Sequence, residues 1–288
     1  MDWAKAKTIL IAAFLVINSF FAYIIFTNGT GSIGYVSSER IKQITDYLAK
    51  NNITVEGKIP VKKTDMPLIT VKYKLFRKED IGVFFSPDEK VEESISGGII
   101  TLRGKDKEIS IKDNRELDYT DSSIRPSDTI SEKVCRRIIK EFLGRLGMKD
   151  DSDIKTVENI EGYKRFVYVQ SFKGAVIYNS IIEIYANDSG IKNARVICFE
   201  AARQLGKKAG VISPVVALLY LPEHNKKVGV PIKKVTEIQQ GYYFGTGTMN
   251  QVDASKVEGG TAFPVWKITT DRDIIYINAY NEKPEGIE

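Results

Sequence analysis

The feature that most constrains this chain is a run of 19 residues without a charge, Thr8 to Phe26. An α-helix of that length rises about 28 Å, which is close to the thickness of the hydrocarbon core of a bilayer. Lipid offers no water to pair with backbone groups, so a segment that crosses it must be helical. We therefore expect residues 8–26 to form a transmembrane helix.

The charges that flank this run predict its orientation. Lys5 and Lys7 precede it, and residues 27–38 contain no basic residue. Because Lys and Arg favour the cytoplasmic side, residues 1–7 should be cytoplasmic and the rest of the chain extracytoplasmic. A cleaved signal peptide is the alternative, but its apolar region is usually shorter, and no cleavage site is evident. We therefore expect a retained anchor in the cell membrane, followed by a Gly- and Ser-rich tether over residues 27–37.

One face of the expected helix is suited to contact with another helix. Small or hydroxyl-bearing side chains recur on it at helical spacing, and they allow close approach of helices in lipid. An amide beside them could form a hydrogen bond across the contact, or could bond to a local carbonyl instead. The predicted partner face is Thr8, Ala12, Leu15, Asn18, Ser19 and Ala22.

Composition bounds the remainder of the chain. The whole chain has 43% hydrophobic and 27% charged residues and a net charge of +5. This composition indicates that the remainder is globular, with acidic and basic residues intermixed. An extracytoplasmic body argues against a nucleic-acid partner. Cys135 and Cys198 are not in a CxxC pair and only one histidine is present, so we expect no metal and no cofactor. Two buried thiols are favoured over a disulfide.

The pattern of elements predicts an α+β fold with tandem units of one helix followed by antiparallel strands. Helices are expected at 38–50, from a capping box at Thr129-x-x-Glu132 to about 146, and from Pro214 onward. Residues 82–85 read as a strand, and 113–127 as a connection between lobes. The predicted division is a first lobe over 38–120 and a second over 121–288, with units at about 128–203 and 211–282.

No catalytic template fits the sequence. His224 is the only histidine, and the sequence shows no partner that would make it a general base. The loop that begins at Gly245 has neither the lysine nor the helix of a phosphate-binding loop. We therefore expect a protein that is not an enzyme.

Aromatic residues gather in the last three expected strands. Two-residue spacing places most of them in the core, and any left at an edge could contact a partner or ligand. The possible partner or ligand surface is Tyr242, Tyr243, Trp266 and Tyr276.

Three passages carry a resemblance to a known family. The opening MDWAKAKTILIAAFLVIN, the central FKGAVIYNSIIEIYANDSGIK and the tail FPVWKITTDRDIIYINAYNEK resemble the YycI-type membrane regulators of Gram-positive bacteria. The units of one helix and three strands also look like PepSY-type modules, a likeness of pattern alone. The family resemblance implies action on a sensor histidine kinase of the WalK/YycG type together with a YycH-type sibling regulator.

Two functional hypotheses follow. The first is a non-enzymatic, membrane-anchored regulator of this kinase, which acts in cell-wall signalling through transmembrane-helix contacts and an extracytoplasmic interaction domain. The alternative is an extracytoplasmic binding module for a wall fragment or peptide that the helix merely tethers. The alternative predicts a concave aromatic pocket between lobes.

Overall fold

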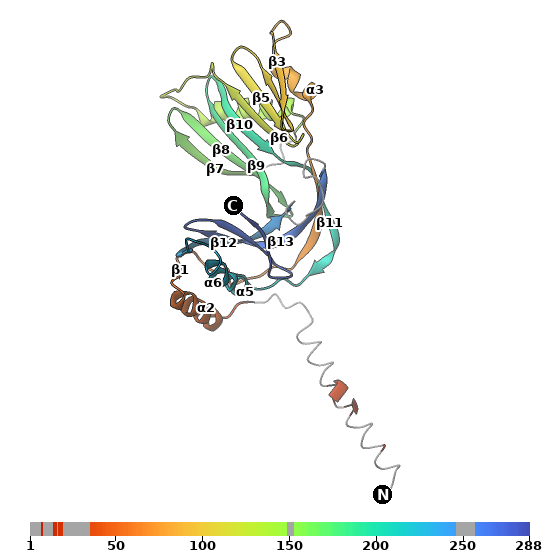
Figure 1. The fold of residues 1–288 in the computed structure, drawn as a ribbon, viewed down its shortest axis with the longest axis vertical. Coiled ribbons are helices and arrows are strands. Elements are labelled where there is room, and N and C mark those ends of the chain that lie inside the picture. The colour runs from red at the N-terminus through yellow and green to blue at the C-terminus, as the bar shows by residue number, and fades with distance from the viewer. Residues whose placement is uncertain (1–6, 8–13, 16, 20–34, 149–152, 246–256) are drawn as a thin grey trace.

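The computed structural model describes residues 7, 14, 15, 17–19, 35–148, 153–245 and 257–288 (Figure 1). The helices within these ranges are α2 (Ser38–Lys50), α3 (Lys78–Ile81), the 3-10 turn η1 (Gly82–Phe84), α4 (Glu132–Arg145), α5 (Pro214–Leu218) and α6 (Tyr220–Asn225). Within the described part of the chain, no helix has the length and apolar character needed to cross a bilayer. Most of the predicted transmembrane segment, residues 8–26, lies outside the described residues.

The strands make the structure a sheet-rich α+β fold, which confirms the expected class in its coarse form. They are β1 (Thr54–Val55), β2 (Met66–Tyr73), β3 (Glu92–Ser96), β4 (Ile99–Arg103), β5 (Lys107–Lys112), β6 (Glu116–Asp121), β7 (Asp153–Ile160), β8 (Tyr163–Phe172), β9 (Ala175–Asn187), β10 (Gly190–Ile197), β11 (Phe199–Ala209), β12 (Lys234–Tyr243), β13 (Gly259–Thr270), β14 (Ile274–Asn278) and β15 (Pro284–Ile287). Their main order in the sheet is β11-β2-β13-β12-β9-β10-β6-β5-β4-β3. Not all pairs are antiparallel, because β12 pairs in parallel with β1 and with β9.

Local sequence explains the first helix. The Ser37 hydroxyl accepts a hydrogen bond from the Arg40 backbone N–H at 3.3 Å, and Glu39 lies in the positive first turn. Ile44 and Leu48 are buried one turn apart, so the apolar face of α2 packs into the core. The bounds of α2 are those expected from the sequence.

The start of α4 differs from the prediction. Ser131, not Thr129, is the N-cap residue, and no side-chain cap is formed there. The backbone N–H of Ser131 instead donates to the Asp188 carboxylate at 2.7 Å, so a turn 57 residues away satisfies this group. Gly147 ends the helix as expected, with a φ of +67° that is costly for other residues.

Two cores divide the chain differently from the expected lobes. The first core contains buried residues of α2, β2, α5, β12, β13 and β14, so the two ends of the body pack together. The second core lies between α4 and the strands β5, β6, β8, β9 and β10. In Figure 1 these occupy the lower and upper parts of the molecule. Helix α2 therefore shares its core with residues beyond 199, and not with the strands near 100–120.

Strand β9 joins the two cores. Its first half contributes Ile177 to the first core, and its second half contributes Ile182 and Ile184 to the second. The parallel contact between Ile177 and Tyr242 links β9 to β12. The sheet is consequently continuous from one core to the other.

Candidate functional site

The predicted helix face is only partly within the described residues. Leu15, Asn18 and Ser19 are helical and exposed, whereas Thr8, Ala12 and Ala22 lie outside the described ranges. The Asn18 side-chain amide donates to the Phe14 carbonyl at 2.7 Å. This is the local bond that the sequence left open as the alternative, and it still leaves the amide oxygen available as an acceptor.

The four aromatic residues of the possible partner surface lie on the two faces of one sheet. Tyr242 and Trp266 are 2% and 0% exposed in the first core, where the Trp266 indole N–H donates to the Ile212 carbonyl at 3.0 Å. Tyr243 and Tyr276 lie on the opposite face with ring centroids 4.4 Å apart. Tyr276 is 2% exposed, and Tyr243 is half-buried. The sheet therefore brings Tyr243 together with Tyr276, and separates this pair from the other two.

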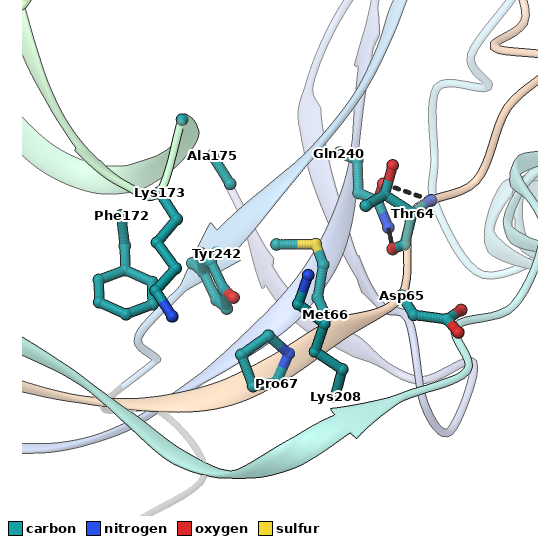
Figure 2. A pocket seen from close by; sticks show the side chains of 11 residues that line it. Thr64, Asp65, Met66, Pro67, Phe172, Lys173, Ala175, Lys208, Gln240 and Tyr242 are labelled. Atoms are coloured by element: carbon teal, nitrogen blue, oxygen red, sulfur yellow. Dashed lines mark hydrogen bonds between the residues drawn. The ribbon is translucent and has the colours of Figure 1, made fainter. Parts of the chain in front are cut away.

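A pocket of about 300 Å³ lies beside the first core, which contains Met66 and Tyr242 of its lining (Figure 2). One wall is the segment before and at the start of β2, with Met66 and Pro67. Another is the turn between β8 and β9, and the remaining wall comes from β11 and β12. The lining residues are Thr64, Asp65, Met66, Pro67, Phe172, Lys173, Gly174, Ala175, Lys208, Gln240 and Tyr242.

Backbone geometry and one amide hold these walls in place. Lys173 and Gly174 have φ values of +52° and +82°, which suit the two central residues of a tight hairpin turn. The Gln240 side chain accepts from the Thr64 backbone N–H at 3.2 Å and donates to the Thr64 carbonyl at 2.9 Å. Both ends of this amide therefore fix the wall before β2 against β12.

The pocket combines cationic groups with an apolar floor. The Lys173 ammonium donates to Gln204 at 2.8 Å and lies 5.3 Å from the centre of the Phe172 ring. Lys173 and Lys208 approach Tyr242 from two sides in Figure 2, whereas Asp65 points away from it. Burial raises the pKa of Tyr242 to about 12, so its hydroxyl is a neutral hydrogen-bond donor at physiological pH. Such a set of groups suits a small ligand that carries an anionic group.

The remaining candidates give no catalytic arrangement. His224 is 7% exposed, and its ring Nδ1 lies 3.4 Å from the Tyr220 hydroxyl. Cys135 and Cys198 are buried free thiols, as the sequence favoured. Among the described residues, no group of three or more His, Cys, Asp or Glu side chains could hold a metal ion.

Sequence reasoning missed the pocket lysines. Lys208 belongs to one of several scattered lysine pairs, and Lys173 precedes a glycine in a short turn between two strands. This short sequence with a glycine is typical of a hairpin turn, so the turn itself could be predicted. Its approach to β11 and β12, however, depends on strand pairing across distant parts of the chain, which no local pattern reveals.

Comparison with known proteins identifies the family. The family model described as YycI protein matches residues 34–280. Among solved structures, the YpeB C-terminal domain of Bacillus megaterium is 14% identical, with a TM-score of 0.38, over 88% of this chain and 97% of that one. An uncharacterized protein from Eubacterium rectale is 10% identical, with a TM-score of 0.46, over 82% and 90%.

YycH from Bacillus subtilis is 12% identical, with a TM-score of 0.43, over 73% of this chain and 52% of that chain. These structural likenesses are too distant to carry a functional argument. No curated protein matches the chain in sequence. The family match covers most of the chain, including the central passage and nearly all of the closing one, whereas the opening passage precedes the matched residues. It confirms the family that the resemblance indicated: the chain belongs to the YycI family.

Proposed function

We propose that this protein is a non-enzymatic regulator of a sensor histidine kinase of the WalK/YycG type. Residues 8–26 anchor it in the cell membrane, with residues 1–7 in the cytoplasm and the folded body outside the cell. The body associates there with a YycH-type sibling regulator. The observation that carries this proposal is the YycI family match over residues 34–280, because that family indicates a regulator of this two-component system.

The anchor is proposed to transmit the effect through helix contacts. The uncharged run, residues 8–26, lies before the matched region and is therefore separate from the folded body in sequence. Its face of Thr8, Ala12, Leu15, Asn18, Ser19 and Ala22 allows close packing against a kinase helix. A coupling of about 1–3 kcal/mol between this contact and the kinase's signalling states would change their ratio 5- to 150-fold.

An anchor swap tests this proposal. Residues 8–26 are replaced by leucine throughout, with the body unchanged, and kinase output and co-purification with the kinase are measured in native membranes. The matched control is the same leucine helix with the six face residues restored. We expect the full leucine anchor to lose both activities and the control to regain them. Unchanged output from the full leucine anchor would refute a helix contact.

The pocket beside the first core favours a second candidate, a binding module for a wall fragment or peptide. Its two lysines and neutral tyrosine suit a carboxylate-bearing ligand, and Phe172 and Met66 supply apolar contacts. Muramyl dipeptide, which carries such a carboxylate, is a suitable probe. At 100 times its Kd, a ligand of the folded state adds about 2.7 kcal/mol of stability. A rise in melting temperature that Lys208→Ala abolishes would support this candidate, and an unchanged temperature would reject it for this ligand.

A further inference from the structure

Strand β3 ends the sheet with an unpaired edge. It pairs with β4 alone among the described strands, and all five residues from Glu92 to Ser96 are exposed. Figure 1 shows β3 and α3 at the end of the sheet farthest from α2, α5 and α6. The free edge of such a strand presents unpaired backbone N–H and C=O groups to a further strand.

An apolar row crosses the sheet and continues to this edge. In successive strands the residues opposite one another are Ile182, Val196, Leu117, Ile111, Ile100 and Ile95. The first four are at most 1% exposed, Ile100 is half-buried, and Ile95 is 69% exposed. The apolar face of the sheet that forms the second core therefore continues to β3, the last strand, where no helix or loop of the described residues covers Ile95.

A groove accompanies this edge. It has a volume of about 900 Å³ and lies between α3, η1 and the segment that leads into β3. Val83, Phe85, Val91 and Leu102 contribute apolar surface, and Val83 is 56% exposed. An ion pair between Lys78 and Glu93 joins the two walls. A strand added to β3 would have alternate side chains next to this groove.

The charge of this region favours one class of occupant. Residues 78–93 contain six acidic and two basic side chains, although the whole chain has a net charge of +5. Two copies of β3 paired in parallel would place Glu92 and Glu93 opposite the same residues of the other copy, which is unfavourable. A strand with basic side chains would meet opposite charge along the same edge.

We propose that the free edge of β3 binds an extended segment of a partner protein in which basic and apolar residues alternate. The segment adds one strand to the sheet, with backbone hydrogen bonds to β3. Its apolar side chains contact Ile95 and the groove, and its basic side chains lie on the opposite face of the sheet, beside Glu92. This site is independent of the anchor contact proposed above.

The direct test uses the full chain in detergent and three labelled seven-residue peptides. The first alternates valine with lysine, the second replaces lysine by glutamate, and the third replaces the central valine of the first by proline. Fluorescence anisotropy reports binding, and hydrogen exchange reports protection of the Glu92–Ser96 amides. We expect the lysine peptide to bind and to protect these amides. Equal binding of all three peptides, or protection elsewhere alone, would overturn the proposal.

A matched pair of substitutions locates the site. Ile95→Lys removes the exposed apolar contact and adds a positive charge that repels the lysines of the peptide. It should weaken binding of the lysine peptide about tenfold. Ile287→Lys makes the same change at an exposed residue of β15 and should leave binding unchanged. Equal effects of the two substitutions would place the peptide elsewhere. Protection of β3 that rises with protein concentration, without peptide, would show self-pairing and also overturn the proposal. Failure here leaves the kinase-helix contact untouched.

Discussion

Replacement of Trp266 tests whether its indole lies at the centre of the first core. The side chain is 0% exposed, and its N–H donates to Ile212 at 3.0 Å. Truncation of a buried tryptophan to alanine removes its apolar contacts and leaves a cavity, which costs about 3–5 kcal/mol. Trp266→Phe fills much of that volume but leaves the Ile212 carbonyl without its donor, so it should cost about 1–2 kcal/mol.

The measurement is urea unfolding of the full chain in detergent, followed by pulse proteolysis, which does not depend on tryptophan fluorescence. At an m-value of about 2 kcal/mol/M, the alanine variant should lower the midpoint by roughly 2 M and the phenylalanine variant by about 0.5–1 M. Leu219→Ala, at a side chain 47% exposed, is the control and should shift the midpoint little. An alanine variant that loses less than about 1 kcal/mol would refute the central position of the indole.

Three further results are expected. Burial acts to raise the pKa of Glu183, but its hydrogen bonds, first of all the one from Arg165, outweigh burial and lower this pKa. The free energy of unfolding should therefore fall as the pH drops below about 4. In acid titrations of unfolding, Glu183→Gln should make that fall shallower. Gly241→Ala should cost about 1–3 kcal/mol in urea unfolding, because its methyl group would lie 2.6 Å from a backbone oxygen, whereas Gly229→Ala, with open space around it, should cost little. Burial raises the pKa of Cys198 to about 12, so alkylation followed by mass spectrometry should show it unreactive until urea unfolds the chain.

Local patterns were sufficient where the physical cause is local. The cap at Ser37 and the apolar spacing of Ile44 and Leu48 define α2, and the turn Asn187–Gly190 defines the hairpin of β9 and β10. Each of these signals lies within a few residues of the element it specifies. The sequence could therefore place these elements without knowledge of the rest of the chain.

Other elements were predicted wrongly. In some a hydrogen bond between near neighbours determines the backbone conformation, and in others polar side chains conceal the pattern of a strand. Residues 82–85 were expected to form a strand, but Asp80 accepts from the Arg77 backbone N–H at 3.2 Å, and the chain turns as α3 and η1. The polar stretch 113–127 contains β6, whose Leu117 and Tyr119 alternate with exposed residues. Residues 203–210 fall between the two predicted units, yet most of them belong to β11, where exposed lysines concealed the strand pattern.

The composition of the cores was beyond local reasoning. The first core depends on the parallel pairing of β1 with β12 and on the pairing of β2 with β13, which join residues nearly 200 positions apart. The pocket depends on two other long-range pairs, of β11 with β2 and of β9 with β12. Its lysines are unremarkable in sequence and become neighbours only when β8 and β9 reach β11 and β12. The proposed function likewise rests on the family match and not on any arrangement of catalytic residues.

Crosslinking from residue 18 in native membranes tests the central claim most directly. A photoreactive amino acid replaces Asn18 in the full-length protein, and the captured chain is identified by mass spectrometry. The matched control carries the probe at Ile17, which lies one helical position away and presents a different side of the helix. Capture of the sensor kinase from position 18, and much less from position 17, is the predicted result. Recovery of the mature protein in the medium, beginning near residue 27, would contradict the account, because no anchor would remain to contact the kinase.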